Sequence, residues 1–250
     1  MDTRAIMPML LYKYGRREHL DQMISKGTVQ IGTVYGYDEA THGPRIGDDN
    51  EGRSRQVFTD ENTRGLSGEV RLPSLFGVPM FNSPDSYGNV AIQDNIGFNY
   101  AIYCVSRCLH RALCKDFCDE YDCAVVVLRP FVFFHHLTNA FQESGLVDAV
   151  RLCQVDDVQY RSRELAPDEG DLVEALIKEP HYQRQAEVRG LWNVGDHPSE
   201  KFYLFDAPAV ASCSRLIPFD ALPSYEPGSP REVVEGQVIE ALRRSEGRGN

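Results

Sequence analysis

The chain is organised around the stretch HYQRQAEVRGLW, residues 181–192, which carries three polar side chains at alternate positions. The second half of this stretch predicts a β-strand, because side chains at i, i+2 and i+4 of a strand point to one face. Gln185, Glu187 and Arg189 would therefore share one face, with apolar side chains on the other. The prediction is a strand over 185–189 that ends near Trp192, the only Trp of the chain.

A carboxamide, a carboxylate and a guanidinium in one row are costly to bury without partners. Such a row suits a site that binds sugar hydroxyls and stabilises a developing positive charge. The alternative interpretation is a half-exposed strand, in which Glu187 and Arg189 form a weak surface ion pair. The residues of this stretch alone leave both interpretations open.

The composition is that of an ordinary globular protein of 250 residues, 42% hydrophobic and 25% charged. A formal net charge of −11 argues against a general nucleic-acid binder, which needs clustered Lys and Arg. No apolar run is long enough to span a bilayer, and residues 1–12 lack a signal pattern, so a cytoplasmic protein without membrane contact is expected. We expect one α+β domain over 1–250, with a core over 9–218, a linker over 219–230 and a C-terminal helix over 231–245.

Five of the seven cysteines fall between Cys104 and Cys123, at spacings that differ from those of zinc ribbons. His110, Cys114 and Cys118 follow one another at single helical turns, so a metal cluster is one interpretation. The other, which we favour, is free thiols packed as small hydrophobes in a reducing compartment. No metal is expected.

Hydrophobic periodicity predicts the order of the elements. The chain opens β-α-β, with strands over 9–14 and 28–35 around a helix over 16–26. A long irregular region follows over 36–99, and here we expect recognition of the acceptor. Further strands are predicted over 55–59, 68–73, 90–93, 98–106, 122–128, 146–161, 201–206 and 214–218, and further helices over 107–118, 130–143 and 168–178. This order favours two packed or split, mainly antiparallel sheets with peripheral helices.

Three motifs together resemble one bacterial family of uncharacterised proteins. They are Tyr12-Lys13-Tyr14 on the first strand, the strand end Tyr103-Cys104-Val105-Ser106, and Gln183-Arg184-Gln185-Ala186-Glu187-Val188-Arg189. Proteins of that family begin with a Y-K-Y strand and carry a D-x-x-E-G turn, here residues 48–52, and a late E-x-E-x-R strand. Their architecture is in turn similar to the ADP-ribosyltransferase fold.

The resemblance implies roles for particular side chains. Glu187 would be the catalytic carboxylate that binds the nicotinamide ribose of NAD and stabilises the oxocarbenium-like transition state. Gln185 would orient the acceptor, and Ser106 would brace the glutamate and the nicotinamide. Tyr12 or Tyr14 would stack on the nicotinamide ring, Lys13 would reach a phosphate, and Arg189 would help to bind the cofactor.

The chain departs from the transferase pattern at three places. The first strand offers Lys13 where an Arg is usual, with Arg16 and Arg17 just beyond it. The serine strand reads Cys104-Val105-Ser106 instead of Ser-Thr-Ser, and the first strand lacks the His-Gly pair of the other transferase class. Ser106 would equally suit the N-cap of a following helix, and the two tyrosines would equally suit core packing.

The resemblance therefore implies an NAD-consuming transferase or glycohydrolase, of the kind found in bacterial toxins, effectors or phage-defence proteins. The acceptor, whether protein, nucleic acid or water, stays open. A second hypothesis is a non-catalytic binding or regulatory module with a protein partner, such as an antitoxin. A third is a metal-dependent nuclease that uses Asp48, Glu51 and a Lys. The acidic turn over 48–52 also resembles a calcium loop but lacks its ligand spacing.

Overall fold

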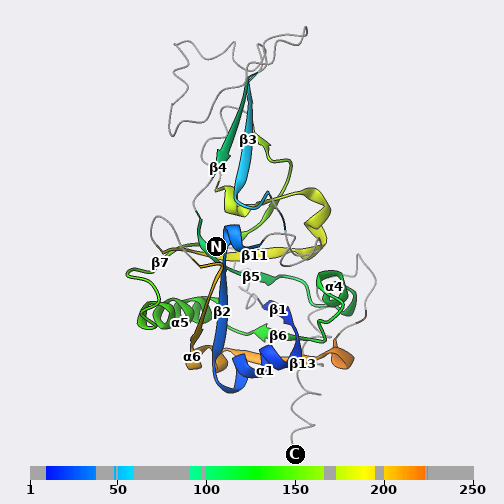
Figure 1. Cartoon of the computed structure of the whole chain (residues 1–250). Helices are drawn as coiled ribbons and strands as arrows, with labels where there is room; N and C mark the ends of the chain where they lie inside the picture. Colours follow the sequence, from blue (N-terminus) through cyan, green and yellow to red (C-terminus); the bar gives the residue numbers. More distant parts are fainter. Residues whose placement is uncertain are drawn as a thin grey trace, which may run out of the picture.

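The computed structural model describes residues 10–37, 48, 50–58, 91–96, 99–165, 173–194, 200–222 and 224. Within them the chain has an α+β fold built on a mainly antiparallel sheet (Figure 1). The predicted fold class is therefore confirmed at this level. The predicted strand over 68–73 and the predicted helix over 231–245 lie outside the described residues.

Eight strands form the main sheet: β1 (Leu11–Gly15), β2 (Thr28–Thr33), β5 (Ala101–Ser106), β6 (Cys123–Val127), β7 (Arg151–Asp157), β11 (Glu187–Asn193), β12 (Phe202–Asp206) and β13 (Ser214–Pro218). The described helices are α1 (Arg17–Ser25), α4 (Arg111–Phe117), α5 (Pro130–Glu143) and α6 (Pro208–Ala211), with 3₁₀ turns η1 (Val34–Gly36), η2 (Glu174–Leu176), η3 (Pro180–Gln185) and η4 (Phe219–Ala221). The strand order is β12-β2-β5-β1-β6-β13, and β11 pairs with β5 and with β7.

The main sheet divides at β5. Along one edge β5 pairs with β11 over its whole length, from Ala101 opposite Trp192 to Ser106 opposite Glu187. Along its other edge it pairs with β2 only near Ala101 and with β1 only at Ser106, which faces Tyr12. β1 and β2 therefore leave β5 at different points, and the sheet is open between them.

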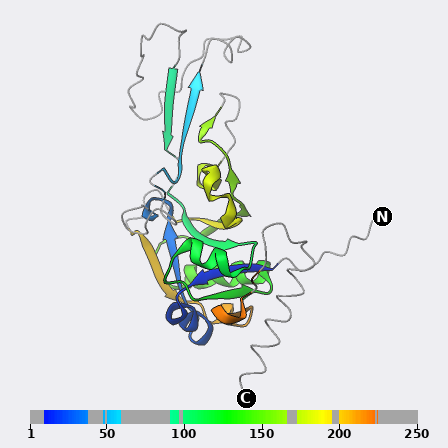
Figure 2. The same cartoon turned by 90° about the vertical axis from the view of Figure 1, so that its right-hand side faces the viewer.

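Two small sheets complete the fold. β8 (Gln159–Tyr160) pairs with β10 (Ile177–Lys178), and β3 (Arg53–Phe58) lies between β4 (Ala91–Ile96) and β9 (Glu164–Leu165). The β3–β4 pair projects from the body as an arm, on the side away from β6 and β13 (Figures 1 and 2). The arm begins directly after the turn that contains Glu51, so its base lies next to β11.

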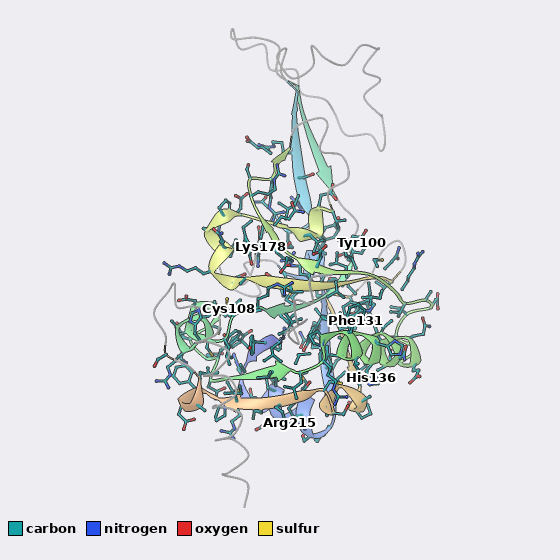
Figure 3. All side chains as sticks on the ribbon, turned by 180° about the vertical axis from the view of Figure 1, so that it is seen from behind. Tyr100, Cys108, Phe131, His136, Lys178 and Arg215 are labelled. Carbon is teal, nitrogen blue, oxygen red and sulfur yellow. The ribbon has the colours of Figure 1, made fainter. Side chains whose placement is uncertain are left out.

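The largest apolar cluster packs α5, α1 and α6 against the main sheet. Phe133, Phe134 and Phe141 of α5 are buried in it, and Trp192 joins them and donates its indole N–H to Thr138 Oγ1 at 2.8 Å. At Gly190 of β11 an added Cβ would lie 2.5 Å from the Phe134 ring. The glycine therefore permits the close approach of helix and strand. α5 also carries Phe131 and His136 on its outer side (Figure 3).

Most predicted elements are found at or near their expected positions. α5 and β6 match the predictions over 130–143 and 122–128, and the opening β1-α1-β2 unit is confirmed. Strands are also found at β3, β4, β7, β12 and β13. These elements have strong local patterns, which explains why the sequence located them.

Three predicted elements differ in the structure. The helix over 107–118 begins only at Arg111, and its N-cap is His110, whose ring accepts from Leu113 N–H at 2.9 Å. The part of the predicted helix 168–178 that is described is instead a 3₁₀ turn followed by the short strand β10. The strand over 185–189 begins only at Glu187, because Gln185 ends the 3₁₀ turn η3 and Ala186 has a left-handed φ of 42°.

The segment over 219–230 was predicted as a linker. Its first residues form the 3₁₀ turn η4, and Leu222 is buried against the cluster around Tyr14. Residues 225–230 lie outside the described part of the chain. No described helix has the length and apolar character that a transmembrane helix requires.

Candidate functional site

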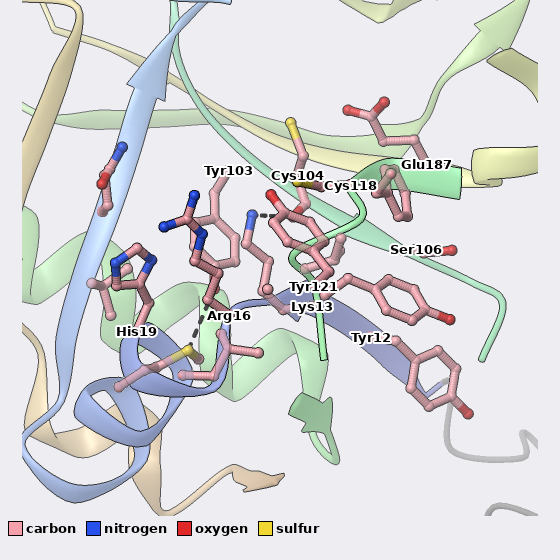
Figure 4. A pocket seen from close by; sticks show the side chains of 18 of the residues that line it. Tyr12, Lys13, Arg16, His19, Tyr103, Cys104, Ser106, Cys118, Tyr121 and Glu187 are labelled. Carbon is pink, nitrogen blue, oxygen red and sulfur yellow. Dashed lines mark hydrogen bonds between the residues drawn. The ribbon is translucent and has the colours of Figure 1, made fainter. Parts of the chain in front are cut away.

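A cavity of about 670 Å³ occupies the opening of the sheet between β1 and β2 (Figure 4). Its walls come from β1, α1, β2, β5 and the start of β11, elements that are far apart in the sequence. Seven residues that the sequence singled out contribute to its lining: Tyr12, Lys13, Tyr14, Ser106, Gln185, Glu187 and Arg189. Tyr12 and Tyr14 are at the same time buried in an apolar cluster with α4, as the core-packing interpretation predicted. The predicted roles of the seven residues stay predictions, but their placement in one cavity is a finding.

Glu187 and Arg189 form a buried ion pair on β11. Arg189 Nε donates to Glu187 Oε1 at 2.7 Å, and the two residues are only 1% and 5% exposed. Arg189 also donates both terminal amino groups to Glu51, at 2.6 and 3.0 Å, and one of them to the carbonyl of Ala175. The half-exposed surface pair considered from sequence is therefore wrong.

Lys178 completes the ion cluster from the short strand β10. Its ammonium donates to Glu187 Oε2 at 3.0 Å and to Gln185 Oε1 at 2.9 Å, and it lies 4.7 Å from the centre of the Tyr182 ring. Seen from behind, Lys178 lies near β11, at the opposite end of the body from Arg215 of β13 (Figure 3). Gln185 is buried with its carboxamide oxygen on Lys178, although it does not belong to the strand.

The acidic turn over 48–52 supplies the second carboxylate of the cluster. Glu51 is 4% exposed and forms the two-bond pair with Arg189, while Asp48 pairs with the buried Arg163. Gly52 has a φ of +68°, and an added Cβ would lie 2.3 Å from Val34 Cγ1. The turn therefore needs glycine at this position in order to hold Glu51 against β11.

Hydrogen bonds to the backbone fix the ends of β5 and β11. The Tyr160 hydroxyl accepts from the Glu187 N–H at 2.6 Å. Ser106 Oγ donates to the Gln185 carbonyl at 2.7 Å and accepts from Cys108 N–H at 3.0 Å. Ser106 therefore braces the residue two positions before Glu187, and the N-cap role considered for it is wrong.

The ion cluster keeps Glu187 charged. Burial alone would favour the neutral carboxyl, but Arg189 and Lys178 hold the pKa of Glu187 well below its usual range. The Cys104 thiol also hydrogen bonds to this carboxylate, and burial together with the charge of Glu187 raises the pKa of Cys104 to about 12. At neutral pH the site therefore holds a carboxylate and a protonated thiol.

Lys13 lies between the ion cluster and the solvent. Its ammonium donates to the Cys104 carbonyl at 3.0 Å and lies 4.7 Å from the centre of the Tyr103 ring. Burial lowers the pKa of Lys13, although the nearby Cys104 and Glu187 oppose this shift. Tyr14 on the same strand is held by its hydroxyl, which donates to Cys108 O at 2.8 Å and accepts from His110 N–H at 2.9 Å.

The cavity has one buried end and one exposed end. The buried end is formed by the ion cluster of Glu51, Lys178, Gln185, Glu187 and Arg189, each of them at most 6% exposed. Of the described lining residues, the exposed ones all come from α1 with its N-cap, β2 and β12: Arg16, His19, Gln22, Gln30 and Leu204. Figure 4 shows Arg16 and His19 on one side, Glu187 on the other, and Lys13, Tyr103 and Cys104 between them.

The charge of the lining is opposite in sign to that of the whole chain. The chain has a formal net charge of −11. Among the described residues, the lining holds four basic side chains and two carboxylates, an excess of two positive charges: Lys13, Arg16, Lys178 and Arg189 against Glu51 and Glu187. A cavity of this kind favours an anionic ligand, because the low-dielectric walls strengthen the local field.

Sequence reasoning missed several members of this site. Lys178 was placed on an acidic helix, and the turn over 48–52 was noted without its contact to Arg189. Glu51 and Arg189 are 138 positions apart, so no local pattern could pair them. Tyr160 gave no signal, whereas Arg16 was at least noted as a cation just beyond the first strand.

The described residues offer little support for a metal. Among them, no three His, Cys, Asp or Glu side chains are arranged to hold one. The seven cysteines are free thiols, and Cys114, Cys123 and Cys213 are buried. Asp48 and Glu51, the carboxylates of the nuclease hypothesis, each pair with an arginine.

Comparison with known proteins gives no relative to guide the assignment. No protein-family model matches the chain, and neither the curated proteins nor the solved structures include a match. The assignment of function therefore rests on the geometry and chemistry of the cavity.

Proposed function

We propose that this protein binds NAD in the cavity and cleaves the bond between nicotinamide and ribose, with Glu187 as the catalytic carboxylate. One observation carries the proposal: the seven residues named from the family resemblance all contribute to the lining of a single cavity, and Glu187 is ionised at its buried end. NAD brings two negatively charged phosphates, which suit the excess of basic side chains in the lining.

Glu187 has the charge and the acceptor capacity that this chemistry needs. A carboxylate accepts about four hydrogen bonds, and Arg189, Lys178 and the Cys104 thiol account for three. The remaining acceptor position is available for a ribose hydroxyl. As nicotinamide leaves with the bonding electrons, positive charge develops on the ribose, and a fixed carboxylate in a buried site stabilises that charge.

The other ions position this carboxylate. Arg189 and Lys178 each take one of its oxygens, so the carboxylate plane is fixed before the substrate arrives. Glu51 balances the second charge of the cluster by its two bonds to Arg189. Lys13 lies between Glu187 and the exposed end, and Arg16 lies at that end, along the path where the phosphates of a bound dinucleotide would pass.

The experiment is nicotinamide release from NAD by the wild type, Glu187→Ala and the isosteric Glu187→Gln. We expect Glu187→Gln to lower the rate by about 10²–10³-fold, the usual loss when one stabilising group is removed from a transition state. Glu164→Gln, at an exposed residue of β9, is the control for the same chemical substitution outside the cavity. Glu51→Gln disturbs the same cluster but keeps the catalytic carboxylate, so an equal loss in that variant would assign the effect to the cluster's structure.

A second candidate is a binding module of the same fold that has no catalytic activity. It is favoured by the two cations at 2.7 and 3.0 Å from Glu187, which compensate its charge within the protein. In that case NAD or another anionic ligand would raise the melting temperature without any release of nicotinamide. No stabilisation by NAD and no release would exclude both the enzyme and the NAD-binding module.

A further inference from the structure

We infer that the acceptor of the ADP-ribosyl group is water, so that the protein hydrolyses NAD instead of modifying a macromolecule. This inference rests on the proposed function, because it concerns the second half of the same reaction. It is carried by the position of Glu187 at the closed end of the cavity and by the inward orientation of Gln185.

The described residues close the buried end of the cavity, where Glu187 lies. Glu187 is 5% exposed, and its neighbours Lys178 and Arg189 are 3% and 1% exposed. The turn that carries Glu51 and the 3₁₀ turn η3 pack around them. Within the described part of the chain, a macromolecular acceptor therefore finds no exposed surface at Glu187 on which to dock.

The exposed end of the cavity is the route by which the substrate enters. Arg16, His19 and Leu204 line that end and are exposed, and Glu187 lies across the cavity from them (Figure 4). A volume of about 670 Å³ is in the range that holds one drug-sized ligand. A bound dinucleotide would fill the passage, so only a small nucleophile could reach the ribose beside Glu187.

Gln185 is not oriented toward an outside acceptor. The resemblance gives this residue the task of orienting the acceptor, and that requires a carboxamide that faces the entrance. Its Oε1 instead accepts from Lys178, its backbone carbonyl accepts from Ser106, and the residue is 6% exposed. Gln185 therefore acts as a positioning residue for Lys178, and through it for Glu187.

The reaction balances with water alone. The bond between ribose C1′ and the nicotinamide nitrogen breaks, and nicotinamide leaves as a neutral molecule with the electron pair. The oxygen of water forms the new bond to C1′ and releases one proton to the solvent. The products are nicotinamide, ADP-ribose and a proton, and no oxidant or metal takes part.

The test uses NAD labelled in the adenylate phosphate, with the full chain, in the presence and absence of bacterial lysate. We expect nicotinamide and free ADP-ribose in equal amounts, no acid-precipitable label, and no faster release when lysate is added. Methanol, a small competing nucleophile, should divert part of the product to methyl ADP-ribose. Label on lysate macromolecules or on the protein itself would overturn the inference and leave the proposed function standing, whereas absence of nicotinamide release would overturn the proposed function.

Two exposed residues of β12 provide a test of the end at which NAD enters the cavity. Leu204 lines the cavity at its exposed end, while Phe202 on the same face of the strand does not. Leu204→Trp should raise KM for NAD by about tenfold with little change in kcat, because it narrows the entrance. Phe202→Trp, the matched control, should leave KM unchanged; equal effects of the two variants would place the entrance elsewhere and overturn the inference.

Discussion

Two strands of the main sheet are equally buried but differ in what they bury. All five residues of β6, Cys123–Val127, are fully buried and apolar, so burial of hydrophobic area explains that strand completely. β11 is buried over Glu187–Trp192, but its first three residues include a carboxylate and a guanidinium. β6 therefore contributes stability alone, whereas β11 contains the candidate site.

Compared with β6, β11 gives up part of the stability that a fully apolar buried strand would contribute. Buried ion pairs often contribute less to stability than apolar side chains of the same volume. β11 keeps Glu187 and Arg189 nevertheless, and three other segments supply Glu51, Lys178 and the Tyr160 hydroxyl as their partners. Because apolar side chains could replace this ion cluster without loss of stability, the cluster is best explained by the cavity that it lines.

The largest expected effect comes from breaking the ion cluster of β11. Arg189→Met leaves Glu51 and Glu187 buried without their common cation, which should lower the free energy of unfolding by about 3–5 kcal/mol. Val125→Ala in β6 removes only apolar contacts and should cost about 1–3 kcal/mol. Urea denaturation measures both, and a smaller loss for Arg189→Met than for Val125→Ala would contradict the cluster's importance.

Acid should weaken β11 while it leaves β6 unaffected. The pKa of folded Glu187 is depressed, so its contribution to stability is present above its unfolded pKa of about 4.3 and is lost as the pH falls toward the folded pKa. In that window the unfolded state binds more protons, so stability falls with falling pH. The difference between wild type and Glu187→Gln should shrink from pH 6 to pH 3, as urea titrations at each pH would show.

Val125→Ala provides the control for this pH dependence. Its effect on stability should stay constant over the same range, because no titrating group is involved. A constant difference between wild type and Glu187→Gln would mean that the Glu187 carboxylate is not depressed in the folded protein.

A glycine substitution tests whether the turn over 48–52 supports β11. Gly52→Ala forces alanine into a left-handed conformation and against Val34, and should cost about 1–3 kcal/mol while it displaces Glu51 from Arg189. Gly145→Ala is the matched control, because Gly145 has a similar φ of +67° but no atom within 4 Å of the added Cβ. If thermal denaturation gave equal losses of stability for Gly52→Ala and Gly145→Ala, the contact with Val34 would contribute nothing to the cost of the Gly52 substitution.

The smallest expected effect concerns two thiols, one near each strand. Cys104 lies beside the ions of β11 and Cys123 belongs to β6, and burial raises the pKa of both. With a pKa of about 12, roughly one Cys104 in 10⁴ is a thiolate at pH 8. The exposed Cys153 should therefore react first with a thiol reagent, as peptide mapping after labelling would show.

The Glu187→Gln variant sharpens this comparison of thiols. It removes one cause of the raised pKa of Cys104 but none of the causes for Cys123. Labelling of Cys104 should therefore become faster in the variant, while labelling of Cys123 stays unchanged. Faster labelling of both thiols would indicate a general loosening of the sheet.

The sequence by itself determined the elements whose patterns are local. The apolar run of β6, the Pro130 start and apolar stripe of α5, and the β1-α1-β2 opening were all found where the residues predicted them. The sequence also named seven of the residues that line the cavity, because the resemblance attached them to short motifs. Each of these inferences depends on residues close together in the chain.

Only the tertiary structure decided what surrounds Glu187. The partners of β11 come from residue 51, 138 positions before Arg189, and from Lys178 on a segment predicted as helix. The left-handed Ala186, which separates Gln185 from the strand, has no signature in the sequence. Burial and ion pairing depend on which distant elements pack together, so a strand that reads as half-exposed became the buried centre of the site.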